Sequence, residues 1–261
     1  CAAKKNIPLV HIEAGLRSFN LEMPEEGNRI LTDHSSELLF TPTDEGVKNL
    51  RNEKINESLV FKCGDIMFDN SIYYKEIAKQ SSFILKNNEL LENEFILFTC
   101  HRPSNTDDKD NLLQILKGVK RVAQLSNKKV VFPVHPRTKK QVDNFFGEEF
   151  LNKEFEEFII IPPASFLDTI LLESNAAFII TDSGGIQKEA YFFKRKSLIL
   201  REQTEWVEIL ANKAALLVGA NEQRIVEGFN KLKDLNANFI PIFGDGKAGY
   251  SICRKILEKL K

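Results

Sequence analysis

The sequence predicts an α/β protein built on doubly wound parallel sheets, and three observations carry this prediction. Short apolar, β-branched runs alternate along the chain with longer amphipathic segments, which is the order of repeated strand–helix–strand units. The runs are continuously apolar, as expected for strands that helices cover on both faces. The chain has 261 residues, 43% hydrophobic and 28% charged, which suits a substantial core divided over about two domains.

Nine apolar runs are expected to be strands: residues 7–12, 38–41, 59–62, 95–100, 130–134, 158–161, 178–181, 197–200 and 215–218. Helical patterns lie between most of them. Asp108 can cap a helix that continues to Gln124, and Glu222–Lys233 has apolar residues at helical spacing. Strands and helices that alternate in this way predict right-handed crossovers and an open sheet.

The polar stretch 80–94 is the best candidate for a domain boundary. Six expected strands follow it, enough for one complete Rossmann-like domain, whereas only three precede it. We therefore expect the remainder of an N-terminal domain at 1–80, a C-terminal domain at 81–240 and a terminal helix at 241–261 that packs back toward the N-terminal domain. Residue 1 is Cys and the first Met is Met23, so we expect a fragment or a processed product.

Charge and composition argue against several classes of function. Lys and Arg total 36 against 37 Asp and Glu, so no basic excess points to nucleic acid or anionic lipid. No apolar run approaches the ~18 residues of a membrane span, and the first residues do not have the pattern of a signal peptide. The four cysteines form no CxxC pair, which argues against structural zinc and a disulfide framework and fits a reducing cytoplasm.

The sharpest motif is TDSGG at residues 181–185, which joins an apolar strand to a helix. Ligands of open α/β sheets bind at the carboxyl ends of strands, and the N–H groups of a helix start can face a phosphate. Ser183 adds a hydroxyl donor, and Glu189 falls near the helix start, where it can accept hydrogen bonds from ribose hydroxyls. We favour a phosphate site over an ordinary tight turn, although the loop lacks the lysine of a P-loop.

A second glycine motif, GDGKAG at residues 244–249, fits a loop before a terminal helix. A dinucleotide site would need a following strand–helix–strand unit and an acidic residue ~20 positions on. The chain ends twelve residues after Gly249. The sequence therefore gives no nicotinamide site, and no cofactor is expected.

Acidic residues gather at the end of one expected strand and at the start of one expected helix. His11 and Glu13 close a strand and, being two residues apart, are expected to share a face. The sequence PEE at 24–26 opens a helix, where simple capping is an equally good explanation of the two carboxylates. Arg29 follows one turn later.

Histidines and arginines gather at two further strand ends. His101 and Arg102 follow the run 95–100, and His135 and Arg137 follow the run 130–134. Two such pairs on one sheet favour an anion site over isolated structural histidines. Metal binding is not expected, because Glu13, His101 and His135 lack the spacing of helical metal ligands.

Five segments of the chain occur in a recognisable order: HIEAGLRSFNLEMPEEGNRILTD, HRPSN, TDSGGIQKEA, TEWVE and FGDGKA. On these segments the chain resembles the non-hydrolysing UDP-N-acetylglucosamine 2-epimerases over essentially its whole length. The resemblance implies a GT-B architecture, two Rossmann-like domains with the active site in the cleft between them, the first domain being incomplete here. It also implies roughly 90 missing N-terminal residues, a little over half of a ~150-residue domain, and therefore a fragment that is inactive alone.

The resemblance implies inversion of C2 in UDP-N-acetylglucosamine to give UDP-N-acetylmannosamine for cell-surface polysaccharides. The C2 proton is not next to a carbonyl, so the family eliminates UDP and adds it back, which needs an acid–base pair and stabilisation of the departing diphosphate. By resemblance, Glu13 and Glu25 are the catalytic carboxylates, His101 assists diphosphate departure, Ser183, Gly184 and Gly185 form the diphosphate loop, Glu189 contacts the ribose, Thr169 meets the uracil, and Arg29, Arg102 and His135 support the site.

Two departures from the family pattern affect these expectations. Trp206 stands where many members have an arginine, which removes one expected phosphate contact, and Ser104 stands where Glu is usual, which weakens the case for a regulatory nucleotide-sugar site. The resemblance also implies a homodimer. Alternatives are an epimerase of a modified UDP-sugar of the diacetamido-uronate type, a GT-B glycosyltransferase, a hydrolysing epimerase, or a fragment that only binds UDP.

Overall fold

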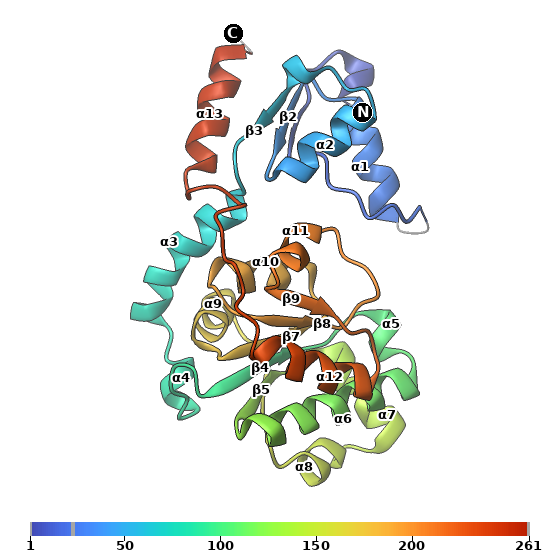
Figure 1. The fold of residues 1–261 in the computed structure, drawn as a ribbon, viewed down its shortest axis with the longest axis vertical. Coiled ribbons are helices and arrows are strands. Elements are labelled where there is room, and N and C mark those ends of the chain that lie inside the picture. The colour runs from blue at the N-terminus through green and yellow to red at the C-terminus, as the bar shows by residue number, and fades with distance from the viewer. Residues whose placement is uncertain (1, 22–23, 260–261) are drawn as a thin grey trace. The chain divides into compact units, whose positions relative to one another are not determined.

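The computed structural model describes residues 2–21 and 24–259, and it forms two compact α/β units (Figure 1). Unit 1 comprises Cys1–Tyr73 together with Ile240–Lys261, and unit 2 comprises Tyr74–Phe239. The division falls within helix α3 (Ile66–Ser81). Both sheets are parallel throughout, so the predicted fold class is confirmed.

Unit 1 contains a three-stranded sheet in the order β1-β2-β3. Its elements in this part of the chain are η1 (Ala3–Lys5), β1 (Val10–Ile12), α1 (Pro24–His34), β2 (Leu38–Thr41), α2 (Asp44–Asn52), η2 (Glu57–Leu59) and β3 (Val60–Lys62). The first strand is shorter than the expected 7–12. Pro8 has no N–H to donate to a ladder, and the pairing with β2 begins only at Val10.

Helices cover both faces of the unit 1 sheet. On one face Leu39 packs with Leu50 of α2. On the other face Leu38 and Phe40 pack with Ile252 of α13 (Ala248–Lys259), the last helix of the chain. The Gly-rich segment 244–249 lies at the start of this helix, as predicted: residues 244–247 form the loop, and Ala248 and Gly249 are the first two helical residues.

Unit 2 contains a six-stranded sheet in the order β6-β5-β4-β7-β8-β9. The strands are β4 (Phe95–Thr99), β5 (Lys129–Pro133), β6 (Phe158–Ile161), β7 (Phe178–Thr181), β8 (Ser197–Ile199) and β9 (Ala215–Leu217). In sequence order this is 3-2-1-4-5-6, the arrangement of a dinucleotide-binding Rossmann fold. All six expected strands are present, each within about a residue of its expected ends.

The helices of unit 2 lie on both faces of its sheet (Figure 1). They are α4 (Ile84–Asn87), α5 (Pro103–Thr106), α6 (Lys109–Ser126), α7 (Pro136–Phe146), α8 (Phe150–Glu154), α9 (Phe166–Asn175), α10 (Gly184–Phe192), α11 (Val207–Ala211) and α12 (Glu222–Lys233). Asp108 caps α6 by accepting a 2.8 Å hydrogen bond from the Asn111 N–H, as predicted.

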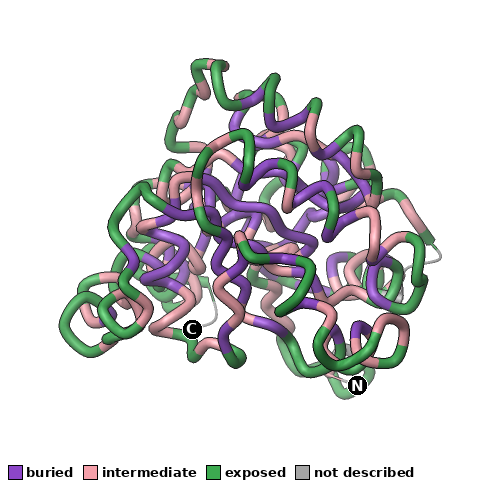
Figure 2. The backbone as a smooth tube through the Cα atoms, turned by 90° about the horizontal axis from the view of Figure 1, so that it is seen from below, coloured by how far each residue is buried: buried purple, intermediate pink, exposed green. Residues whose placement is uncertain are grey.

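The core of unit 2 follows from the alternation of side chains along β4. Ile96 and Phe98 face α6 and α12, whereas Phe95 and Leu97 face α9 and α10. Gly118 of α6 allows close packing against α12, because a Cβ there would lie 2.8 Å from the Ile225 side chain. Figure 2 shows the result along the backbone, where buried stretches are flanked by exposed turns and helix faces. Within the described residues, no helix is both long and apolar enough to cross a membrane.

Candidate active site

The carboxyl ends of β4 and β7 form the topological switch point of the unit 2 sheet. These strands are neighbours, but the chain leaves β4 toward β5 on one side and leaves β7 toward β8 on the other. Open α/β sheets bind ligands in the crevice at this point. His101 and Arg102 follow β4, and Ser183 follows β7, so the sheet brings two of the predicted motifs to the same place.

Asp182 joins these two loops through its fully buried carboxylate. It accepts hydrogen bonds from the backbone N–H groups of His101 and Arg102, both at 2.9 Å, and from the Asn105 side chain at 3.1 Å. Burying a charged group is costly unless its oxygens are satisfied in this way. The sequence marks Asp182 only as part of TDSGG, whereas in the folded protein its carboxylate fixes the His101 backbone.

The His101 side chain is partly exposed at the edge of the crevice. Its Nδ1 lies 3.2 Å from an Asp182 carboxylate oxygen, and its ring lies 5.6 Å from the His135 ring, centroid to centroid. With Nδ1 facing a carboxylate, Nε2 is the nitrogen that remains for an incoming ligand. His101 and His135 are thus brought together, as the sequence predicted for an anion site.

The start of α10 has the features of a phosphate site. Ser183 is the N-cap residue, and its hydroxyl oxygen accepts a 3.4 Å hydrogen bond from the Ile186 N–H. No acidic side chain lies in the first turn of α10, where it would offset the positive end of the helix dipole. The N–H groups of Gly184 and Gly185 lie in this first turn, which is where helices bind anions.

Two guanidinium groups reinforce the positive charge at this helix start. A Cβ on Gly184 would lie 3.9 Å from Arg201 Nη1 and 4.0 Å from Arg102 Nη2. Arg201 is 8% exposed and pairs with Glu205 at 3.2 Å. Arg102 is among the residues expected from the sequence and Arg201 is not. Arg201 follows β8 closely, and β8 is the neighbour of β7, so its place at a strand end is the signal that could have indicated it.

Trp206 contributes no charge to this region. Its ring is 4% exposed and lies under the Lys188 ammonium, 4.2 Å from Nζ to the ring centroid. The residue that departs from the family pattern is therefore built into a buried cation–π contact rather than exposed as a polar group.

A pocket of about 160 Å³ lies next to the crevice. His101 and His135 line one part of it, and Pro163, Thr169 and Ile186 line others, so a mostly apolar wall adjoins polar edges. This is the usual composition of a pocket for a planar organic group. The structure thus places Thr169 and both histidines around one cavity.

Glu189 is half-buried on α10, and Glu173 of α9 is fully buried near it. Among the residues that the structure describes, neither carboxyl oxygen of Glu173 finds a hydrogen-bond partner. Burial raises the pKa of Glu173 well above its usual range, and the charge of Glu189 raises it further. The structure thus places a buried carboxyl with a raised pKa beside Glu189, a feature that no motif in the sequence indicates.

In unit 1, Glu13 follows β1 in an unusual backbone conformation. Its φ is +72°, in the left-handed region that residues other than glycine rarely adopt. The strand ends at Ile12, so the expectation that His11 and Glu13 share a strand face is wrong: the backbone turns out of the β conformation at Glu13 itself.

The two carboxylates at the start of α1 differ sharply in their surroundings. Glu26 is 1% exposed and accepts hydrogen bonds at 2.9 Å from the Ser18 N–H, the Ser18 hydroxyl and the Phe19 N–H, while Arg29 lies 3.5 Å away. Glu25 is exposed. Helix capping alone would not distinguish the two carboxylates. In the structure Glu26, with Arg29 beside it, binds the loop at Ser18 and Phe19, whereas Glu25 is exposed to solvent.

The predicted site residues thus fall into two groups. Unit 2 brings together His101, Arg102, His135, Thr169, Ser183, Gly184, Gly185 and Glu189 at or near one sheet edge. Glu13, Glu25 and Arg29 belong to unit 1. Among residues 2–21 and 24–259, no three His, Cys, Asp or Glu side chains are grouped closely enough to hold a metal ion.

Comparison with known proteins identifies the family to which this architecture belongs. The family model described as UDP-N-acetylglucosamine 2-epimerase matches residues 1–257. A UDP-N-acetylglucosamine 2-epimerase homolog of Methanococcus maripaludis is 42% identical over 260 residues, which are 99% of this chain and 70% of that protein. UDP-2,3-diacetamido-2,3-dideoxy-D-glucuronate 2-epimerase of Pseudomonas aeruginosa is 40% identical over 228 residues, 87% of this chain and 61% of that protein.

The fold comparison agrees. The crystal structure of Methanocaldococcus jannaschii UDP-GlcNAc 2-epimerase in complex with UDP-GlcNAc and UDP superposes with a TM-score of 0.88 at 36% identity, covering 98% of this chain and 71% of that one. The two parallel sheets, the switch-point crevice and the family match over nearly every residue lead to one conclusion: the chain belongs to the UDP-N-acetylglucosamine 2-epimerase family.

Proposed function

We propose that the full-length protein carrying this sequence is a UDP-sugar 2-epimerase that interconverts UDP-N-acetylglucosamine and UDP-N-acetylmannosamine. The observation that carries the proposal is the family match over residues 1–257, together with the similarity to an enzyme solved with UDP-GlcNAc and UDP. The crevice of unit 2 supports it, because it offers a helix start, two guanidinium groups and an adjoining pocket to a nucleoside diphosphate.

The chemistry requires two proton transfers and a departing diphosphate. A base removes the C2 proton, the C2–H electron pair forms the C1=C2 double bond, and the C1–O bond breaks so that UDP leaves with its electron pair. An acid then protonates C2 on the opposite face, and UDP adds back to C1. Each positioned acid or base typically contributes ~10²–10⁴-fold to such a step.

We assign the nucleotide to unit 2. The diphosphate would bind the N–H groups at Ser183–Gly185, with Arg102 and Arg201 balancing its charge. The uracil would occupy the pocket beside Thr169, and Glu189 would accept hydrogen bonds from the ribose. His101 Nε2 would donate a proton or hydrogen bond to the leaving diphosphate, with Asp182 holding the other ring nitrogen.

We assign the proton transfers at C2 to Glu13 and Glu25. Two observations support this choice over other carboxylates of unit 1. Glu13 has a strained backbone, which in folded proteins concentrates at functional sites. Glu25 is exposed, whereas the carboxylate of its neighbour Glu26 already accepts three hydrogen bonds from within the protein.

A modified UDP-sugar is the second candidate substrate. It is favoured by the 40% identity to the Pseudomonas aeruginosa enzyme named for UDP-2,3-diacetamido-2,3-dideoxy-D-glucuronate. The two substrates share C1, C2 and the nucleotide, so the assignments above serve both. We also infer a cytoplasmic location from the free thiols Cys63, Cys100 and Cys253, and a homodimer in solution, which light scattering of the full-length protein would test.

Proton exchange at C2 tests the proposal directly. The full-length protein in D₂O should introduce deuterium at C2 of one of the two UDP-sugars, followed by ¹H NMR. Glu13→Gln and Glu25→Gln should each slow this exchange at least 100-fold and leave the affinity for UDP within about threefold, since general acid–base groups contribute ~10²–10⁴-fold. Less than a tenfold loss in both variants would remove these residues from the mechanism, and no exchange in the unaltered protein with either sugar would refute the function.

A further inference from the structure

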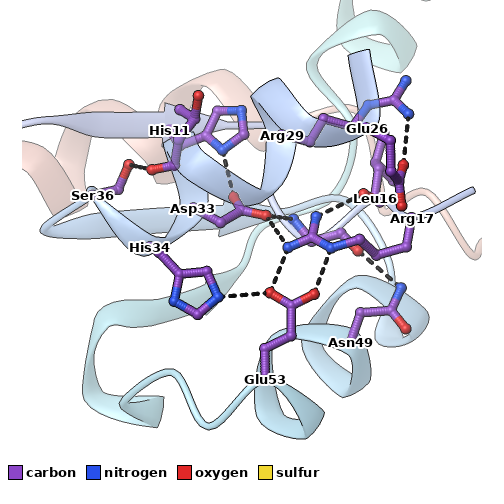
Figure 3. Close-up of polar contacts among 12 residues, drawn as sticks. His11, Leu16, Arg17, Glu26, Arg29, Asp33, His34, Ser36, Asn49 and Glu53 are labelled. Carbon is purple, nitrogen blue, oxygen red and sulfur yellow. Dashed lines mark hydrogen bonds and ion pairs between the residues drawn. The ribbon is translucent and has the colours of Figure 1, made fainter. Parts of the chain in front are cut away.

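An ionic network joins His11 and Arg17, which lie on either side of Glu13 in the sequence, to α1 and α2 (Figure 3). At its centre is Asp33 of α1, whose side chain is fully buried. Asp33 accepts a hydrogen bond from His11 Nδ1 at 2.5 Å and from the Gly15 N–H at 3.1 Å, and it pairs with Arg17 Nη2 at 2.7 Å. One carboxylate therefore holds three residues that flank Glu13 on both sides.

The network continues beyond Arg17. The Arg17 Nε and Nη2 groups donate to the two carboxylate oxygens of Glu53 at 2.6 and 2.8 Å, and Nη1 donates to the Leu16 carbonyl at 2.7 Å. Burial lowers the pKa of Arg17, but its hydrogen bonds to Glu53 and Asp33 outweigh burial and raise it. The hydrogen bond from Arg17 lowers the pKa of Glu53. Arg17 and Glu53 are both charged at neutral pH.

The backbone around Glu13 leaves little freedom. Gly15 has φ of +82°, and a Cβ there would lie 2.3 Å from the Gly46 carbonyl oxygen, so this chain segment passes directly against α2. The Asn49 side chain donates to the Gly15 carbonyl at 2.9 Å. The left-handed conformation of Glu13 is itself unfavourable for a residue other than glycine. Such a conformation persists only where its surroundings fix it. The Ala14 N–H donates to the Phe40 carbonyl at 2.9 Å, and Asp33 supplies side-chain bonds on both sides of Glu13, at His11 and at Gly15.

We propose that Asp33 is the positioning residue for the Glu13 carboxylate. The inference rests on the proposed function, in which Glu13 transfers a proton at C2. Asp33 acts through the two ends of the segment: His11 before Glu13, and the Gly15 N–H after it. Proton transfer needs near-attack placement, and a displacement of 1 Å can cost about 10²-fold in rate. A carboxylate suits this task because its two oxygens accept three donors at once, whereas an amide offers one oxygen.

The competing explanation is that the network only stabilises unit 1. Glu53 provides a matched control, because it binds the same Arg17 but touches neither His11 nor Gly15. Asp33→Asn and Glu53→Gln each replace a carboxylate by its amide and each deprive Arg17 of one anionic partner. A purely structural role predicts that both variants lose activity in proportion to their loss of stability. Positioning predicts a loss of turnover in Asp33→Asn alone.

The experiment measures kcat, KM, UDP affinity and urea unfolding for both variants of the full-length protein. We expect Asp33→Asn to lower kcat 10- to 100-fold with KM and UDP affinity within about threefold, and Glu53→Gln to keep kcat within about threefold. Equal kcat in the two variants, or a kcat for Asp33→Asn that matches the unaltered protein, would overturn the proposal.

A third variant covers the case in which Asp33→Asn does not fold. His11→Ala removes one of the three ties at a side chain that is 20% exposed, so the fold should tolerate it. We expect at least a fivefold fall in kcat at unchanged UDP affinity, and an unchanged kcat would overturn the proposal. Exchange at C2 separates this inference from the function itself: no exchange in the unaltered protein would refute the proposed function whatever Asp33 does. Full exchange in both the unaltered protein and Glu13→Gln would leave the function standing and overturn this inference, because Glu13 would then transfer no proton.

Discussion

Replacing Gly184 by Ala should weaken UDP binding without harming the fold. Gly184 is the first residue of α10, and its backbone is not in the left-handed region. Outside the adjoining backbone of α10, the nearest described atom to a Cβ built on it is Arg201 Nη1 at 3.9 Å, so the protein leaves room for a methyl group. The space that the methyl would fill is the approach of an anion to the helix start, between Arg102 and Arg201.

The expected size of the effect follows from the contacts at risk. A hydrogen bond to a charged group contributes about 1.5–3 kcal/mol. Loss of one such bond between the α10 start and the diphosphate corresponds to about 10- to 100-fold in affinity, since about 1.4 kcal/mol is tenfold. The free energy of unfolding should stay the same or rise by about 0.4–1 kcal/mol, because alanine restricts the unfolded chain.

Calorimetric titration with UDP and with uridine separates the phosphate contribution from the base. We expect Gly184→Ala to lose affinity for UDP and to bind uridine as the unaltered protein does. Gly27→Ala is the matched control: Gly27 also lies in the first turn of a helix, and within the described part of the chain its Cβ would meet nothing within 4 Å outside the adjoining backbone. UDP affinity in Gly184→Ala equal to that of the control would refute a phosphate site at this helix start.

Two further predictions concern buried carboxyl groups. Burial raises the pKa of Glu173 above its unfolded value of about 4.3, so the folded state holds the proton more tightly, and stability is lost as the pH rises from that unfolded value through the folded pKa. Relative to Glu173→Gln, the unaltered protein should lose up to about 1.4 kcal/mol of unfolding free energy per pH unit in that window, measured by urea midpoints between pH 4 and 8. A difference between the two proteins that does not change with pH would contradict a raised pKa for Glu173. Glu26→Gln should cost about 1–3 kcal/mol of unfolding free energy, because it disrupts the buried acceptor of three hydrogen bonds. Glu25→Gln should change the free energy of unfolding by no more than about 0.5 kcal/mol. Thermal and urea unfolding of the two variants would contradict this prediction if both were destabilised equally.

The sequence by itself determined the strands, the helices between them and the place of the phosphate motif. Apolar runs and helical spacing are local signals. A strand that is covered on both faces needs apolar residues at nearly every position, so each buried strand can be recognised from its own sequence. The helix cap at Asp108 and the turn at Ser183 also depend on neighbours within three residues. These parts of the fold could be predicted because each arises from a few consecutive residues.

Tertiary structure decided which side chains are used, and in each case the deciding partner is distant in sequence. Asp182 holds the backbone at His101, 81 residues away. Arg201 comes to Gly184 only because β7 and β8 are neighbours in the sheet. Asp33 reaches back across 22 residues to His11, on the segment that carries Glu13. No pattern in a single sequence records such pairings, because they are set by the order of strands in a sheet and by the packing of helices against it.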